Sequence, residues 1–243
     1  MKDYVRQNKS AWEFNAYEFW VEHDGTPEER ARRDLEDPVG MLKKYAAYFD
    51  TYEGIRVANI CGSCGKKAIP LAVLGAEVTI FDISERNMRY ALETAEAAGV
   101  SVDFVLGDVL EADMEKYGGF FDVVFMEGGF LRPGGRMIAS DFHPFQKVMD
   151  IMDFEQPVTD YFSTEIVRGE MAHARFYPEE IRKQFPMCEY RKYTMSEIIN
   201  AVIESGFLLK RFDEYPAWTD KRYPGEFTIL AVRDANVQNA AGE

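Results

Sequence analysis

Two short apolar runs separated by a glycine-containing turn organise the first half of the chain. The first run covers residues 56–60, the second covers residues 78–81, and a stretch of helical length lies between them. The turn extends from Cys61 to Gly65, and the second run ends in Asp82. Short apolar runs bounded by turn residues are typical of buried strands. The pattern therefore predicts a strand, a glycine loop, a helix and a second strand.

This unit predicts a nucleoside-bearing ligand. Small residues let the loop backbone turn sharply and approach a ligand, while the amides at the start of the next helix point toward it. Asp82 follows Gly65 by 17 positions, close to the roughly 20 expected of an acid that accepts hydrogen bonds from ribose hydroxyls. Only Gly62 and Gly65 of a G-x-G-x-x-G dinucleotide pattern are present. The loop by itself is therefore a weak signal.

Three further segments follow at the intervals of an alternating α/β fold. Residues 102–108 end in Gly-Asp, residues 121–129 read Phe-Asp-Val-Val-Phe-Met-Glu-Gly-Gly, and residues 131–138 begin Leu-Arg-Pro-Gly-Gly. Together with the first unit they resemble the class I S-adenosylmethionine-dependent methyltransferases, in particular the group that acts on small molecules. The resemblance covers roughly residues 50–142. Its most specific part is Phe-Asp-Val-Val followed by Leu-Arg-Pro-Gly-Gly.

The resemblance implies a fold, a cofactor and a site. The fold is a Rossmann-like three-layer α/β sandwich, with a mostly parallel seven-stranded sheet that ends in an antiparallel hairpin. The cofactor is S-adenosyl-L-methionine, with its methionine part at the first loop, its ribose at Asp82 and its adenine amino group at Asp108. The implied cofactor-binding residues are Tyr17, Asn59, Cys61, Gly62, Ser63, Gly65, Asp82, Ile83, Asn87, Gly107, Asp108, Val109, Met126, Glu127 and Gly128.

The first loop departs from the family pattern. The family usually has an acid where this chain has Asn59, and glycines where it has Cys61 and Ser63. Gly65 matches, whereas Gly62 is one position out of register. Because side chains at positions 61 and 63 narrow the room for a ligand, the assignment rests more on Asp82 than on the loop.

A second departure is a short connection. The family implies that residues 123–126 and 136–140 form neighbouring parallel strands, but only the nine residues 127–135 join them. A parallel crossover usually takes about a dozen residues or more, most often with a helix. Three alternatives are open: the helix has been lost, the recorded chain lacks a segment, or the two runs do not pair.

Composition predicts a single globular domain over residues 1–243, of which 47% are hydrophobic. No apolar stretch approaches the roughly 18 residues of a membrane span, and the N-terminus lacks the apolar core of a signal peptide. We therefore expect a cytoplasmic monomer or homodimer without a membrane partner. The net charge of −14, from 42 acidic and 28 basic residues, argues against nucleic acid as a substrate.

The chain has three cysteines, too few for a disulfide framework. Cys61 and Cys64 have the C-x-x-C spacing of a redox or zinc site. A structural zinc site needs four ligands, however, and no second pair supplies the others. We interpret both residues as small side chains of the turn and predict no metal site.

Aromatic segments flank the region of resemblance. Residues 1–50 are expected to form a helical cap, broken near residues 25–27, with Tyr17 in contact with the ligand. Residues 144–193 hold nine aromatic side chains interrupted by prolines, which predicts a lid over an acceptor or a dimer surface. Beyond them, Thr194 and Glu197 have the spacing of a capping box, and residues 207–212 and 227–232 predict a final strand pair.

The predicted reaction is methyl transfer to an oxygen, nitrogen or carbon nucleophile of a small molecule. The enzyme mainly has to hold this nucleophile about 3 Å from the methyl group, in line with the C–S bond, and exclude water. His143 follows the expected fifth strand and is a candidate general base, or else it caps the turn before Pro144. Glu127 is the second candidate base. Another nucleotide-dependent enzyme and a catalytically inactive binding protein are alternative functions, and the sequence does not identify the acceptor.

Overall fold

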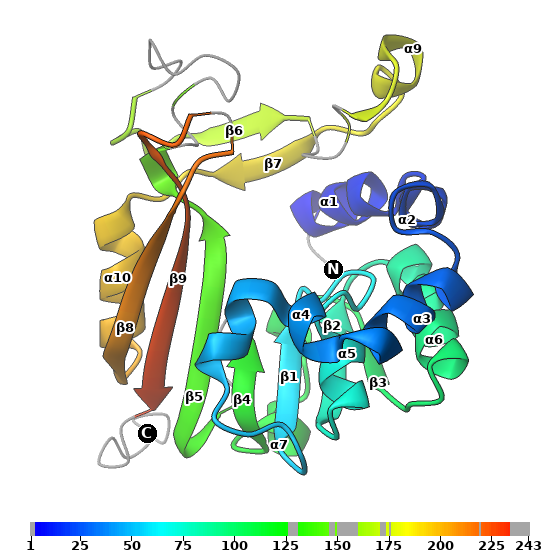
Figure 1. Ribbon diagram of the computed structural model, residues 1–243. Helices are drawn as coiled ribbons and strands as arrows, with labels where there is room; N and C mark the ends of the chain where they lie inside the picture. The colour runs from blue at the N-terminus through cyan, green and yellow to red at the C-terminus, as the bar shows by residue number, and fades with distance from the viewer. Residues whose placement is uncertain are drawn as a thin grey trace.

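The computed structural model describes residues 3–125, 131–145, 149, 160–170, 174, 176–218 and 220–233. Its central layer is a seven-stranded sheet with the strand order β3-β2-β1-β4-β5-β9-β8. Helices α3 to α6 cover one face of this sheet, and α7 and α10 lie on the other (Figure 1). The predicted three-layer α/β fold is therefore confirmed.

Neighbouring strands among the first five run parallel, and the last two close the sheet as an antiparallel hairpin. The early strands are continuous apolar runs because a parallel sheet is covered on both faces. The seven strands of the sheet are β1 (Arg56–Ile60), β2 (Glu77–Asp82), β3 (Asp103–Leu106), β4 (Phe121–Phe125), β5 (Leu131–Phe142), β8 (Phe207–Pro216) and β9 (Pro224–Arg233).

Short helices lead into the sheet and cover its first face. The predicted break near residues 25–27 is confirmed: α3 begins at Pro27, and Thr26 and Glu29 form a capping box in front of it. The elements are α1 (Asp3–Glu13), α2 (Ala16–Asp24), α3 (Pro27–Glu36), α4 (Pro38–Leu42), the 3₁₀ helix η1 (Lys43–Tyr48), α5 (Ala68–Val73) and α6 (Glu85–Ala97).

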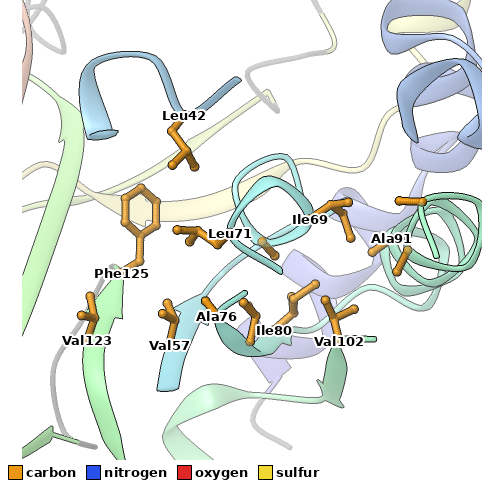
Figure 2. Packing of buried hydrophobic residues seen from close by; sticks show 14 of the residues in the cluster. Leu42, Val57, Ile69, Leu71, Ala76, Ile80, Ala91, Val102, Val123 and Phe125 are labelled. Atoms are coloured by element: carbon orange, nitrogen blue, oxygen red, sulfur yellow. The ribbon is translucent and has the colours of Figure 1, made fainter. Parts of the chain in front are cut away.

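The main core lies between these helices and the sheet. Figure 2 shows Leu42, Ile69 and Leu71 from the helices above Val57 and Ile80 from the strands. All five side chains are buried. This layer holds the β1–α5–β2 unit rigidly, since close-packed apolar side chains leave little room for movement.

The second face is covered more sparsely. The 3₁₀ helix η2 (Val109–Glu111) and α7 (Met114–Tyr117) lie beside β3, and α10 (Met195–Glu204) packs near the final hairpin. The capping box of Thr194 and Glu197 is present at the start of α10, as predicted. The antiparallel pairing of β8 with β9 confirms the predicted strand pair.

Strands β4 and β5 are parallel neighbours, with Val124 beside Met137 and Phe125 beside Ile138. The alternative that these two runs do not pair is therefore wrong. Strand β5 also begins at Leu131, five positions before the expected start at residue 136. A strand can extend through a register shift such as the one between Phe121 and Val123. The link over residues 126–130 lies outside the described residues.

A second, two-stranded sheet stands above the carboxyl ends of the parallel strands, next to α1 (Figure 1). It pairs β6 (Ile166–Gly169) with β7 (Cys188–Arg191), and α9 (Glu179–Arg182) lies between them in sequence. We call helices α1 and α2 together with this sheet the roof. Within the described ranges, no helix is both long and apolar enough to cross a membrane.

The two halves of the roof are joined by α1. The amide of Asn8 donates to the backbone oxygen of Glu189 at 3.1 Å and accepts from the backbone nitrogen of Glu189 at 3.1 Å. Gln7 donates to the backbone oxygen of Met187 at 2.8 Å. A small apolar cluster also spans both halves: Ala11, Phe14, Ala174, Tyr177, Ile181, Phe185 and Cys188.

Candidate active site

The first loop has the backbone of a glycine loop although two of its positions are not glycine. Cys61 has φ 49°, Ser63 has φ 52° and Gly65 has φ 78°. All three φ angles lie in the left-handed region, which residues other than glycine rarely adopt. The loop therefore departs from the family pattern in its residue types but not in its backbone, which turns at Cys61 and Ser63 as it would at glycines.

Gly62 is required for a different reason. A Cβ atom at this position would lie 2.7 Å from Asn59 Oδ1 and 2.8 Å from Ile80 Cγ2. The loop therefore rests directly on β1 and β2, with the buried Asn59 side chain beneath it. Only glycine permits this close approach.

Asp82 links the loop to the next helix. Its Oδ2 accepts a hydrogen bond from the backbone nitrogen of Ser63 at 2.9 Å. Its Oδ1 accepts from the backbone nitrogen of Ser84 at 2.9 Å and from Asn87 Nδ2 at 3.3 Å. Burial raises the pKa of Asp82 above its ordinary value, and these hydrogen bonds oppose that rise. The structure thus brings Ser63, Asp82 and Asn87 together at the carboxyl edge of the sheet.

The predicted adenine segment lies beside Asp82. The backbone nitrogen of Gly107 donates to the backbone oxygen of Asp82 at 2.9 Å. Asp108 Oδ1 accepts from the backbone nitrogen of Leu110 at 3.0 Å, which orders the turn that contains the half-buried Val109. Ile83 is half-buried next to Asp82. These residues follow adjacent strands, as expected for one extended ligand.

A cavity of about 410 Å³ opens between the roof and the loop. Six of its lining residues are tryptophans or phenylalanines from segments far apart in the sequence, and two have charged side chains. Of the predicted cofactor residues, Ser63 and Asn87 line it. We call it the aromatic cavity, and its lining residues are Trp12, Ala16, Phe19, Trp20, His23, Asp24, Ser63, Lys66, Asn87, Phe142, Phe176 and Trp218.

The sequence patterns predicted no ligand-binding role for most of these lining residues. The roof is tied to the site through Trp20, whose indole nitrogen donates to Asn87 Oδ1 at 2.8 Å. Trp218 comes from the link between β8 and β9, where no motif marks it. The remaining signal was the aromatic content of residues 12–20 and 144–193, which is also what a buried helix face produces.

Tyr17 lies outside this cavity lining. Its hydroxyl donates to Glu93, and its ring packs edge-on against Tyr90 at a centroid distance of 5.8 Å. The hydrogen bond to Glu93 raises the pKa of Tyr17. In the structure Tyr17 fastens α2 to α6, and its contact with a ligand stays a prediction.

His143 is held by the chain on both sides of its ring. Nδ1 accepts from the backbone nitrogen of Phe145 at 3.1 Å, and Nε2 lies 3.0 Å from Glu214 Oε1. This places the proton of the neutral imidazole on Nε2. Burial lowers the pKa of His143. The bond to Phe145 fits the turn-capping alternative. His143 is not among the lining residues of the aromatic cavity, and its role as a general base stays a prediction.

Met126, Glu127 and Gly128, the other predicted site residues, lie outside the described residues. The C-x-x-C pair is described, and its two thiols differ. Cys61 is exposed and Cys64 is buried, with no disulfide between them. Burial raises the pKa of Cys64 to about 12, which is the opposite of an activated thiolate.

Comparison with known proteins agrees with this geometry. Residues 57–136 match the model of a methyltransferase domain family. The chain is 26% identical over 173 residues to a ubiquinone biosynthesis O-methyltransferase of Methylocella silvestris, covering 65% of this chain and 66% of that protein. It is 42% identical over 73 residues to the protein of the same name from Rhizobium leguminosarum, covering 30% and 28%.

Solved structures share the fold. A putative S-adenosylmethionine-dependent methyltransferase from Listeria monocytogenes superposes with a TM-score of 0.61 at 17% identity, over 80% of this chain and 98% of that one. Magnesium protoporphyrin IX methyltransferase from Synechocystis, with bound S-adenosylhomocysteine, superposes with a TM-score of 0.55 at 17% identity, over 96% and 100%.

Residues 57–136 thus match a methyltransferase domain family, and the chain shares the fold of S-adenosylmethionine-dependent methyltransferases. The matches to the curated relatives span 66%, 54% and 28% of those proteins. The chain thus aligns with less than two thirds of each relative's length.

Proposed function

We propose that this chain transfers the methyl group of S-adenosylmethionine to a small molecule bound in the aromatic cavity. The observation that carries the proposal is the loop around Gly62, which has left-handed residues on both sides and is fastened to the Asp82 carboxylate. Such a loop approaches a ligand through its backbone, and the acid next to it accepts hydrogen bonds from hydroxyl groups.

The described residues fit the methyl donor. The missing Cβ at Gly62 lets the loop lie directly on Asn59 and Ile80, which holds its backbone at the carboxyl edge of the sheet where a ligand would bind. Asp82 and Asn87 would face the ribose, Asp108 the adenine, and Ser63 the methionine part. The donor supplies a methyl group that is already electrophilic. The task of the protein is therefore to align the nucleophile and to exclude water.

The aromatic cavity suits a flat acceptor. Rings of Trp12, Phe142, Phe176 and Trp218 come from the cap, from β5, from the insertion and from the final link. Aromatic walls bury a large apolar area and stack on planar ligands. The curated relatives carry the name O-methyltransferase. We therefore propose an aromatic hydroxyl compound as the acceptor, and Glu127 stays the candidate for its base.

Calorimetry with the purified chain tests the donor site first. S-adenosylhomocysteine should bind, and an acceptor panel of phenols, amines and carbon nucleophiles should show which class releases it from S-adenosylmethionine. Binding without turnover on any class would support the catalytically inactive alternative. Absence of binding to both S-adenosyl compounds would contradict the proposal itself.

Substitution of Asp82 tests whether the carboxylate that holds the loop also contributes to donor binding. Asp82→Asn should weaken S-adenosylhomocysteine binding about tenfold or more, because the charge-assisted hydrogen bonds of the carboxylate are lost. In the wild type the affinity should fall as the pH drops through the raised pKa of Asp82. Asp103→Asn, an exposed acid on β3, is the matched control. Equal affinities of the two variants would contradict the assigned role.

A further inference from the structure

Asp24 and Lys66 form an ion pair in the wall of the aromatic cavity. Lys66 Nζ lies 2.5 Å from Asp24 Oδ2, and both residues line the cavity. Asp24 is the last residue of α2 in the roof, whereas Lys66 directly follows the loop. His23 is titratable, and the other lining residues are aromatic or uncharged. One negative and one positive group therefore share a wall that otherwise suits apolar or neutral ligands.

The Asp24 carboxylate has one charged group at close range, the Lys66 ammonium. Oδ2 is buried and accepts no hydrogen bond within the described part of the chain, although the Lys66 ammonium is close. Oδ1 lies 3.9 Å from an Arg30 nitrogen, beyond hydrogen-bond distance. Buried polar atoms in folded proteins are nearly always hydrogen-bonded. Because the close partner of this carboxylate is the partly exposed Lys66 ammonium, a cationic group of a ligand in the cavity could take the place of that partner.

The position of Asp24 in its helix also argues against a stabilising role. A carboxylate at the carboxyl end of a helix meets the negative end of the helix dipole. Asp24 closes the nine-residue α2, where a cation would be favourable. Lys66 is likewise available, because 42% of its side chain is exposed and its Nζ lies 4.6 Å from the centre of the Trp20 ring.

The loop offers no negative charge of its own to a ligand. None of residues 59–65 is acidic, and the Asp82 oxygens already accept from Ser63, Ser84 and Asn87. The methionine end of the methyl donor carries one ammonium and one carboxylate. A zwitterion at this end of the cavity needs one anion and one cation at close range, which is what Asp24 and Lys66 provide.

We propose that Asp24 binds the α-ammonium and Lys66 the α-carboxylate of the methionine part of the donor. The ion pair exchanges its internal contact for two contacts to the zwitterion, so the roof and the loop close on the same group. The inference rests on the proposed function, because it concerns the donor of that reaction. In this proposal the negative charge that the loop lacks comes from Asp24 at the end of α2.

Analogues that lack one charge provide the test. The affinities of S-adenosylhomocysteine, its decarboxylated analogue and its deaminated analogue are measured by calorimetry for the wild type, Asp24→Asn and Lys66→Met. The wild type should bind each analogue about tenfold or more weakly than the parent, as expected for a lost charge-assisted hydrogen bond. Asp24→Asn should weaken the parent similarly but leave the deaminated analogue unchanged. Lys66→Met should leave the decarboxylated analogue unchanged.

Glu22→Gln, an exposed acid on α2, and Lys9→Met, whose ammonium pairs with Glu85 3.0 Å away, are the matched controls. Both should bind all three ligands as the wild type does. Equal weakening of all three ligands by Asp24→Asn, or equal affinity of the wild type for all three ligands, would overturn the inference. Because the wild-type comparison needs no variant, a variant that fails to fold does not block the test. A wild type that binds no S-adenosylhomocysteine would instead contradict the proposed function.

Discussion

The floor and the roof of the site are built in opposite ways. The floor, from β1 through Asp82, comes from residues 56–82, and the Ser63–Asp82 hydrogen bond spans 19 positions. The roof joins segments from opposite ends of the chain, and the Asn8–Glu189 contacts span 181 positions. The floor is a local unit stabilised by buried strands, whereas the two halves of the roof are joined by side-chain contacts between distant segments.

This difference predicts different mobility. Regions with few buried contacts open at lower free energy than the core does. The floor packs on buried residues such as Ile80 and Ile69, while the small cluster that joins α1 to the region of β7 has four buried members. We therefore expect the roof to open for ligand entry while the loop keeps its shape.

The largest effect should come from adding one methyl group to the floor. Gly62→Ala places a Cβ 2.7 Å from Asn59 Oδ1 and 2.8 Å from Ile80 Cγ2. The loop must shift, with a loss of about 1–3 kcal/mol in the free energy of unfolding and a loss of donor binding. Urea unfolding and calorimetry measure both. Gly54→Ala is the control, because its Cβ would meet nothing within 4 Å although φ is 73°. Because an alanine at Gly54 is strained by its positive φ, donor binding separates the two variants: loss of donor binding in both would mean that close packing is not the reason for Gly62.

A smaller effect should follow from cutting the roof contact. Asn8→Ala removes both hydrogen bonds to the Glu189 backbone, with a local loss of about 1–2 kcal/mol. Hydrogen exchange should quicken in α1 and β7 and stay unchanged in β1 and β2. Ser10→Ala, which removes a bond to Arg6 within the same helix, is the control. Faster exchange throughout the sheet would show that roof and floor open together.

His143 separates a structural role from a catalytic one. Its folded pKa lies below the ordinary 6.5, so the unfolded chain takes up the proton first as the pH falls. Its contribution to stability is therefore present above about pH 6.5 and is lost as the pH drops toward the lowered folded value. His143→Gln should flatten this part of the unfolding profile and retain turnover. Lost turnover with an unchanged unfolding profile would restore His143 as the candidate base.

The smallest effect concerns backbone strain in the loop. Cys61→Gly and Ser63→Gly should each raise the free energy of unfolding by up to about 1 kcal/mol, because glycine accepts φ near 50° without penalty. The extra freedom of glycine in the unfolded chain reduces this gain. Ser101→Gly, at an exposed position without positive φ, should be slightly destabilising. Losses at all three positions would indicate that the side chains at 61 and 63 make favourable contacts.

Much of the floor could be predicted from the sequence because its signals are local. Continuous apolar runs give the buried strands, and an acid that closes one of them must lie at the sheet edge. The caps at Thr26 and Thr194 depend on residues three positions away. The conformations of Cys61 and Ser63 could not be predicted in this way, since their residue types disfavour positive φ.

The sequence by itself determined the class of fold, the early strands along the chain and the place of Asp82 at the end of one of them. Only the tertiary structure decided which side chains form the aromatic cavity, because Trp12, Phe176 and Trp218 meet across distant segments. It also decided that Glu214, 71 positions after His143, engages the imidazole, and that Asp24 faces Lys66. Periodicity and caps report on neighbours along the chain. Side-chain partners brought together by folding leave no such local pattern.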